Sequence, residues 1–438
     1  MVECKDKMFF FANKLVSMPI RIVAFAFLLF ANIAFAAEWT MFHGPDGKNR
    51  SSETGLLTSW SEGGPKLLWK IDNIGEGVSG YSSVTIQNGR LFTSGEREGR
   101  ILVYCFNLDG KLLWQYDNGQ TWLPRNFPGP RSTPTVYGEF VYDFSPHGEL
   151  VCLKVSNGEK VWGRNMLTDF EGENIIWGLS ESIRIDGDKL YCSPGGAKAS
   201  FVALNKRTGE IIWTTPSLGD KTSYGSPIIF EHGGLRMIVT TYANGMFGVH
   251  SENGELLFRF RHPQKYGINS TRPIYHDGFL YLTNTWDDRG GEGGGEGAVK
   301  LRLTVTDGKV SLEEIWRDRT LDSLHDNVML IDGFLYGVSF GHRGGAFVCV
   351  DWKTGEARYE HRSVGRGSSL TWAEGLFYLL CERGDVMLIR PNPEKFDVMS
   401  QFQLPEGGEG LVWAHPVVCG KRLYIRHGTF LYCYDIAR

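Results

Sequence analysis

One short alternation of apolar and polar residues recurs along most of the chain, and its most regular copy spans residues 203–213. Less regular copies span 152–162, 248–258 and 349–359, and a shorter one spans 105–114. Each copy has an apolar strand, a turn that contains glycine, and a second strand that ends at or near a large aromatic residue. Glycine suits such turns because it adopts positive φ without steric cost. The pattern predicts a sheet structure built from equivalent units.

A second hairpin precedes each copy of this pattern. Residues 182–191 place two apolar runs around Asp186-Gly187, and residues 328–336 do the same around Asp332-Gly333. Two hairpins in each repeat make four antiparallel strands, which is the content of one propeller blade. The sequence therefore predicts an all-β fold.

The large aromatic residues at the ends of the repeats predict the number of blades. Eight such anchors follow one another at intervals of 43 to 58 residues. They are Trp69, Trp114, Trp162, Trp213, Phe258, Trp316, Tyr359 and Phe402. The longest interval contains a stretch rich in glycine and glutamate, 287–297, which we interpret as a loop insertion. We predict an eight-bladed β-propeller.

The two ends of the repeat region complement each other. Residues 433–438 match the first half of the repeat without its last strand, and residues 66–69 match the second half. We therefore predict that the N-terminal strand pairs with the C-terminal blade. Closing the ring in this way removes two exposed sheet edges.

The repeat resembles that of pyrroloquinoline quinone (PQQ)-type eight-bladed propellers, whose pattern is A-x-D-x-x-T-G-x-x-x-W. Residues 203–213 fit it with Asn205 in place of Asp, and residues 349–359 fit it with Asp351 and Thr354-Gly355. The opening residues 39–45 and the stretch 177–182 are similar to a bacterial group of single-domain PQQ-like propellers. This resemblance covers nearly all of the chain after the first 36 residues.

In PQQ dehydrogenases the cofactor lies at one end of the central channel, beside Ca²⁺ held by carboxylate and amide oxygens. The resemblance places the segments that precede the innermost strands at that end. Their candidate residues are Arg131, Trp177, Glu181, Arg272, His325, Asp326, Asn327, Arg366, Trp413 and His415.

Several of these candidates have chemistry suited to a quinone and its cation. Arg131 and Arg272 can bind carboxylates of an anionic ligand, or they can pair with carboxylates of neighbouring blades. Glu181 and Asn327 can supply oxygen ligands to Ca²⁺, with Asp326 as a general base, or such groups can cap strand ends.

Four further candidates are aromatic. Trp177 and Trp413 can stack on a planar ligand or pack between blades. His325 and His415 can bind a metal or move protons, or they can be hydrogen-bonded structural groups. The PQQ alcohol dehydrogenases also carry two adjacent cysteines, and this chain has no adjacent pair and no C-x-x-C-H haem motif.

Net charge and the N-terminal sequence restrict the classes of partner and the cellular location. A net charge of −4 without a basic run argues against nucleic acid and anionic membrane surfaces. Lys14 and Arg21 precede the apolar run 22–36, which ends in an Ala-x-Ala cleavage pattern. We predict a signal peptide at 1–36, with Met18 as an alternative to Met1 as start, and a single propeller domain at 37–438. The product is then periplasmic or secreted, without a membrane span.

Seven cysteines remain after this predicted cleavage, which is an odd number. Cys105, Cys152, Cys349 and Cys433 occupy the repeat position that holds Ala203 in another blade. This equivalence predicts small buried packing residues rather than disulfides.

Two functions from different classes remain open. The first is a non-catalytic binding or scaffold protein of the periplasm or cell envelope, with a protein or glycan partner. The alternative is a PQQ- and Ca²⁺-dependent dehydrogenase of alcohols or sugars, in which the quinone carries the redox chemistry. We expect a monomer, because a closed propeller leaves no sheet edge that demands a partner.

Overall fold

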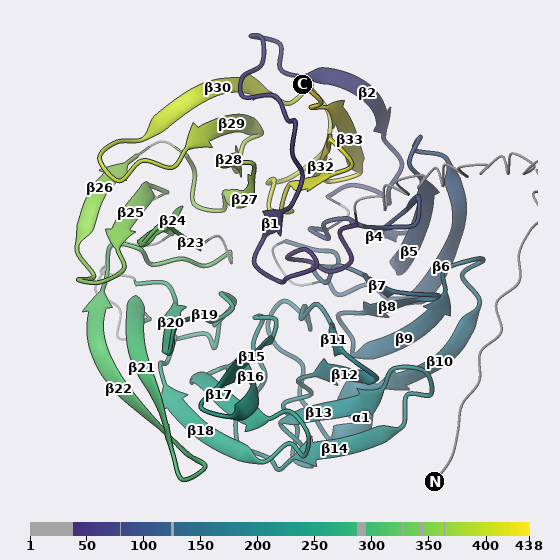
Figure 1. The fold of residues 1–438 in the computed structure, drawn as a ribbon. Coiled ribbons are helices and arrows are strands. Elements are labelled where there is room, and N and C mark those ends of the chain that lie inside the picture. Colours follow the sequence, from purple (N-terminus) through teal and green to yellow (C-terminus); the bar gives the residue numbers. More distant parts are fainter. Residues whose placement is uncertain are drawn as a thin grey trace, which may run out of the picture. The chain divides into compact units, whose positions relative to one another are not determined.

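The computed structural model describes residues 38–438 except 79, 124–126, 287–294, 326–327, 341–344 and 363. The predicted signal peptide lies outside the described residues. Residues 36–438 form one compact unit. In this unit, eight blades of four antiparallel strands stand around a common centre, and a short fifth strand pairs with one of them (Figure 1). The predicted all-β, eight-bladed propeller is confirmed.

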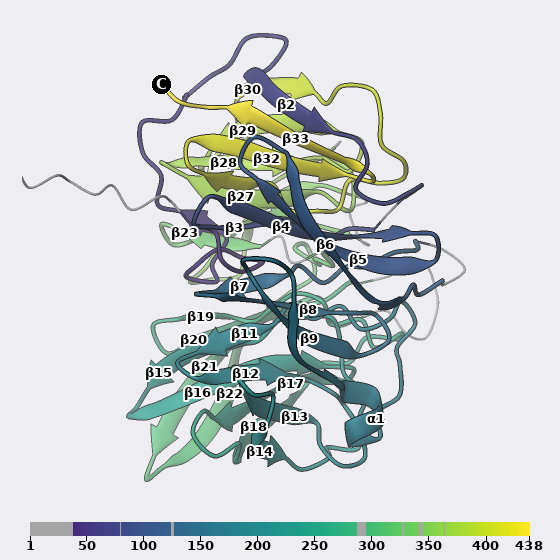
Figure 2. The same ribbon diagram turned by 90° about the vertical axis from the view of Figure 1, so that its right-hand side faces the viewer.

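The blades follow the chain in order, each from an inner to an outer strand (Figures 1 and 2). Blade 1 consists of β3–β6 (Thr85–Gln87, Arg90–Arg97, Arg100–Asn107, Leu112–Gln120), and blade 2 consists of β7–β10 (Thr135–Tyr137, Phe140–Phe144, Glu149–Lys154, Lys160–Asn165). Blade 3 consists of β11–β14 (Arg184–Asp186, Lys189–Cys192, Phe201–Asn205, Ile211–Thr215), and blade 4 consists of β15–β18 (Ile228–His232, Leu235–Tyr242, Gly245–His250, Leu256–Arg261). Blade 5 consists of β19–β22 (Ile274–His276, Phe279–Thr283, Ala298–Thr306, Lys309–Asp318), and blade 6 consists of β23–β26 (Met329–Ile331, Phe334–Val338, Phe347–Asp351, Ala357–His361). Blade 7 consists of β27–β30 (Ser369–Ala373, Leu376–Leu380, Asp385–Arg390, Asp397–Gln403). Blade 8 consists of β31–β33 (Val417–Cys419, Arg422–His427, Phe430–Asp435) together with β2 (Lys66–Ile71). A short helix, α1 (Met166–Phe170), follows β10.

The predicted closure of the ring is confirmed. Strand β2 is the outer strand of blade 8 and pairs antiparallel with β33, with Trp69 opposite Cys433. Both ribbon views show the two strands side by side (Figures 1 and 2). The last blade therefore receives its fourth strand from a segment more than 350 residues earlier in the chain.

Aromatic anchors lock neighbouring blades together. The indole Nε1 of Trp213, on β14, donates to the backbone oxygen of Ser251 in the next blade at 3.1 Å. Trp162 makes the same contact with the backbone oxygen of Lys206 at 2.9 Å. The residue opposite most anchors is small, as at Ala203 beside Trp213, whereas Lys300 lies opposite Trp316. Large and small side chains therefore alternate where the sheets pack.

One anchor differs from the sequence prediction. In blade 7 the bulge that follows every anchor pair falls between Leu388 and Ile389, which places Ser400 in register with the other anchors. Phe402 lies two residues further along β30, where it meets the ring of Trp60 at 5.6 Å. The backbone N–H of Trp60 donates to Ser400 Oγ at 3.1 Å. The N-terminal segment thus supplies the aromatic side chain that this position of blade 7 lacks.

The cysteines behave as the repeat predicts. All seven cysteines among the described residues are buried free thiols. Cys105 and Cys152 lie opposite the anchors Trp114 and Trp162. Burial raises the pKa of the Cys105 thiol to about 11. These thiols are therefore protonated packing groups at neutral pH.

A segment before the first blade crosses the centre of the ring, and we call residues 38–51 the strap (Figure 1). Trp39 bridges to Ile86 in blade 1, and the oxygen of Thr40 accepts from Val136 in blade 2. At the other end, β1 (Arg50–Ser51) pairs in parallel with β27 of blade 7. The strap therefore spans the channel from one side of the ring to the other.

Within the described residues, no helix is both long and apolar enough to span a membrane.

Candidate functional site

An aromatic cavity of about 300 Å³ occupies the end of the channel where the inner strands begin, and we call it the aromatic pocket. Its aromatic lining consists of Phe42, Tyr81, Phe127, Trp177, Tyr224, Phe340 and Trp413. Phe42 belongs to the strap, and the others come from blade loops. The lining therefore combines nearly the whole ring of blades with the N-terminal segment.

One register position builds most of this lining. Tyr81, Arg131, Ser180, Tyr224, Ser270, His325 and Trp413 each lie four residues before an inner strand, and all seven line the pocket. In blade 7 we locate the equivalent position from the turn that follows the inner strand, at Glu374. Gly367 lies seven residues before this turn residue. A Cβ there would come 2.0 Å from Nε1 of Trp413, so the glycine leaves room for the indole.

Trp413 is the centre of the aromatic contacts. Its ring centroid lies 4.7 Å from that of Tyr81, 4.8 Å from that of Phe127 and 4.7 Å from that of His325. Its Nε1 donates to a carboxylate oxygen of Glu382 at 2.9 Å. This indole is thus held on several sides by the protein's own groups.

Arg131 supports the wall of the pocket. Its guanidinium donates to the backbone oxygens of Phe127 at 2.6 Å, Trp177 at 3.0 Å and Gly129 at 3.3 Å, and it lies 5.3 Å from the ring centroid of Tyr81. Burial lowers the pKa of Arg131 to about 10, so it stays charged at neutral pH. Because its donors hold loop carbonyls, Arg131 orders the loops around the cavity.

The histidines of the pocket have different surroundings. Nε2 of His325 is buried without a hydrogen-bond partner among the described residues, and burial lowers the pKa of His325 to about 3. His415 contacts the strap through Nδ1, 2.9 Å from Nδ2 of Asn49. His325 is therefore neutral at physiological pH, and His415 helps to hold the strap in place.

Glu181 does not line this pocket. It is buried in blade 3, where its carboxyl oxygens accept from the backbone N–H of Ser193 at 2.8 Å and from Ser193 Oγ at 3.0 Å. Burial raises the pKa of Glu181 to about 8. Glu181 directly follows Ser180, but only Ser180 lines the pocket, whereas the side chain of Glu181 contacts Ser193.

The structure separates the remaining candidates. Trp177 and Arg366 line the aromatic pocket together with Arg131. Arg272 instead lines a second cavity beside the strap, and the two cavities share no lining residue. Asp326 and Asn327 lie outside the described residues, directly after His325.

The sequence analysis did not select Tyr81, Phe127, Tyr224 or Glu382. Three of these four residues are aromatic, like the predicted candidates Trp177 and Trp413. The position four residues before an inner strand could have identified Tyr81 and Tyr224, because they share it with Arg131 and Trp413.

The described residues do not fit a quinone with Ca²⁺. The described lining contains one carboxylate, that of Glu382, and it already accepts from Trp413. Arg131 donates to loop carbonyls. No group of three His, Cys, Asp or Glu side chains suited to a metal occurs in the described part of the chain. Calcium needs several oxygen ligands, which these residues do not supply.

Fold and site together define a PQQ-like β-propeller with an aromatic channel end. Residues 44–193 and 177–396 match the family described as outer membrane protein assembly factor BamB. These matches cover well over half of the sequence, so the chain belongs to this family.

Individual relatives are distant. An outer membrane protein assembly factor BamB from Kangiella koreensis is 24% identical over 225 residues, which is 50% of this chain and 52% of the relative. The chain thus aligns with about half the length of that protein. The crystal structure of BamB from Moraxella catarrhalis superposes with a TM-score of 0.55 at 14% identity, covering 81% of this chain and 94% of that chain. The quinohemoprotein alcohol dehydrogenase from Comamonas testosteroni gives 0.62 at 11% identity, covering 93% and 82%. Both likenesses show the fold.

Proposed function

We propose that this protein is a non-catalytic binding and scaffold propeller of the periplasm or cell envelope, and that it docks a protein partner on the end of the ring that carries the aromatic pocket. Membership of a family described by an outer membrane assembly factor supports this function. So does the chemistry of the pocket, where Arg131 and Trp413 already donate to other groups of the protein.

Exposed apolar loop residues at this end carry the proposal. Leu123 is 72% exposed, Ile176 50% and Tyr266 55%. They lie in the loops before the inner strands of blades 2, 3 and 5, and Nε1 of Trp122 ties the first loop to the second through the oxygen of Ile176 at 2.9 Å. Large apolar side chains that remain exposed around a cavity mark surfaces that bind other proteins.

The experiment introduces a photo-reactive phenylalanine analogue at positions 123, 176 and 266 in the full chain and irradiates living cells. We expect discrete cross-linked adducts at these positions and none at Ile211, an outer-strand residue of similar exposure, 45%. Changing Leu123 or Ile176 to Asp should abolish the adduct formed at position 266, while the thermal midpoint stays unchanged. Adducts that persist in both variants, or that form equally at position 211, would contradict docking at this end.

The dehydrogenase alternative is tested separately by calorimetric titration of residues 37–438 with PQQ in millimolar Ca²⁺. We expect no saturable heat. Saturable binding that Trp413→Ala weakens, together with dye reduction by an alcohol or sugar, would replace the scaffold proposal by the redox function.

A further inference from the structure

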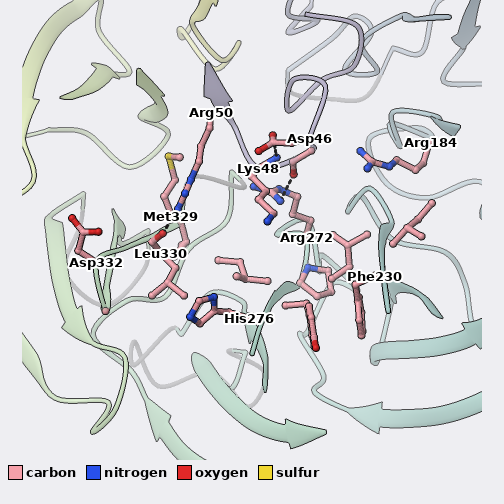
Figure 3. Close-up of a pocket in the computed structure, with 18 residues that line it drawn as sticks. Asp46, Lys48, Arg50, Arg184, Phe230, Arg272, His276, Met329, Leu330 and Asp332 are labelled. Atoms are coloured by element: carbon pink, nitrogen blue, oxygen red, sulfur yellow. Dashed lines mark hydrogen bonds between the residues drawn. The ribbon is translucent and has the colours of Figure 1, made fainter. Parts of the chain in front are cut away.

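A second cavity, which we call the strap pocket, lies beside residues 46–50 of the strap (Figure 3). It has a volume of about 630 Å³, and its wall comes from the inner strands β11, β15, β19 and β23. The aromatic pocket lies where the inner strands begin, whereas this cavity lies along the strands themselves. A cavity of this size accommodates a small organic molecule.

Positive charge gathers in the strap pocket, although the chain as a whole has a net charge of −4. Four cationic side chains line it, against the two carboxylates of Asp46 and Asp332. The cationic residues are Lys48, Arg50, Arg184 and Arg272. The backbone N–H of Lys48 donates to Asp46 at 2.8 Å, so part of that carboxylate's hydrogen-bonding capacity is already used by the strap itself.

Arg184 lacks the partner that a buried guanidinium normally has. Its Nε is buried without a hydrogen-bond partner among the described residues, and its Nη1 contacts the thioether sulfur of Met41 at 3.5 Å, a weak acceptor. The nearby carboxylate of Asp186 accepts instead from Arg236 at 2.7 Å. Burial, and then repulsion by Arg272, lower the pKa of Arg184.

The strap brings the two arginines together. Arg272 donates from Nη1 to the backbone oxygen of Gly47. Nη1 of Arg184 packs against the same residue, so closely that a Cβ on Gly47 would lie 2.4 Å from it. Figure 3 shows both side chains extending toward the strap. Two like charges held at one glycine repel each other, and an anion between them would relieve that repulsion.

The opposite part of the wall is apolar. Phe230 and Ile274 are only partly buried and face the cavity, as does Leu330. The ring of Phe230 stacks on that of Tyr275 with centroids 3.9 Å apart, which fixes its orientation. The pocket therefore offers a rigid apolar surface beside a pair of guanidinium groups.

We propose that the strap pocket binds a small molecule that carries one oxyanion, a carboxylate or a phosphate, on an apolar body. The oxyanion lies between Arg184 and Arg272, and the apolar body lies against Phe230 and Ile274. This site is independent of the proposed docking end, because the two cavities have no lining residue in common.

The test is calorimetric titration of residues 37–438 with octyl phosphate and with octanoate, below their critical micelle concentrations. Inorganic phosphate serves as the anion without an apolar body, and octyl glucoside as the apolar body without charge. We expect one saturable site for at least one of the two amphiphilic anions, weaker binding of inorganic phosphate, and none of octyl glucoside. The tighter of octyl phosphate and octanoate identifies the oxyanion.

Variants locate the site. Arg184→Met and Arg272→Gln should each weaken binding by about tenfold or more, whereas Arg131→Gln in the aromatic pocket should leave it unchanged. Arg184→Met should also raise the thermal midpoint of the free protein, because it removes a charged group whose buried Nε has no hydrogen-bond partner among the described residues. A merely structural arginine would give the opposite shift.

No saturable heat with either amphiphilic anion would overturn the proposal, and so would equal affinity in Arg184→Met. Arg272 also contacts the strap, so Arg272→Gln can fail to fold. In that case the result for Arg184→Met alone decides the test. Either failure leaves the cross-linking result at the other end of the ring unaffected, so the two proposals fail separately.

Discussion

The indole of Trp213 lies against Gly254 of the neighbouring blade, so closely that a Cβ on this glycine would come 2.3 Å from Cε3 of the ring. The same contact joins Trp114 to Gly158, Trp162 to Gly209 and Trp316 to Gly355. The turn of the repeat therefore requires glycine for two reasons. Glycine adopts the positive φ, and it leaves room for the aromatic anchor of the neighbouring blade.

This relationship predicts the effect of adding one methyl group. Gly254→Ala should lower the free energy of unfolding by about 2–4 kcal/mol, because the new Cβ strains the positive φ and displaces the indole. The matched control is Gly375→Ala, at a turn with φ of 82° and nothing within 4 Å of the added Cβ. It should lose only about 1 kcal/mol, the cost of the backbone conformation. Urea unfolding measures both, and equal losses would show that the indole contact contributes nothing.

The repeat made most of the fold predictable. An aromatic anchor and a turn glycine recur in most blades, so the spacing from Trp69 onward counts the blades and residues 66–69 show which strand closes the ring. Blade 7 escaped the pattern because Ser400 replaces the anchor and Trp60 compensates from a distant segment. Local periodicity cannot reveal a compensation between residues 340 positions apart.

The candidate site was predictable only in part. Arg131 and Trp413 were found because both precede inner strands. Arg272 also precedes one, but by two residues rather than four, and it lines the strap pocket instead. The strap itself has no periodic pattern, and its contacts, such as Asn49 with His415, join residues far apart in sequence. These contacts depend on the closed ring and could not be inferred before it.

Ring closure by β2 predicts different outcomes for two N-terminal deletions. A protein starting at residue 52 loses the strap but keeps Lys66–Ile71, so it should have the same oligomeric state as the full chain. A protein starting at residue 72 exposes the edge of β33, whose unpaired backbone groups invite pairing with other chains. We expect the longer deletion to form oligomers or aggregates in size-exclusion chromatography with light scattering. A monomeric, cooperatively folding product of that deletion would show that the outer strand is dispensable.

Glu181 gives the stability a pH dependence. Its folded pKa, about 8, lies above the ordinary value of 4.5, so the folded state holds a proton that the unfolded state releases between these pH values. Its contribution is fully present below pH 4.5 and is lost as pH rises toward 8, by up to about 1.4 kcal/mol per pH unit. Glu181→Gln should therefore be more stable, relative to wild type, at pH 8 than at pH 5. Urea unfolding at both pH values tests this, with exposed Glu62→Gln as the control, which should follow the wild type.

His325 gives a dependence of the opposite sign. Its folded pKa, about 3, lies below the ordinary value of 6.5, mainly because burial disfavours the imidazolium. Its contribution to stability is thus complete above pH 6.5 and is lost as pH falls toward 3, since only the unfolded state takes up the proton. His325→Phe keeps a ring beside Trp413 without titrating, so the variant should gain stability over wild type between pH 7 and pH 5, by up to about 1.4 kcal/mol per pH unit. Exposed His361→Phe serves as the control. If the wild type and His325→Phe lose stability in parallel on acidification, the imidazole accepts a proton in the folded pocket and its burial is not what the structure indicates.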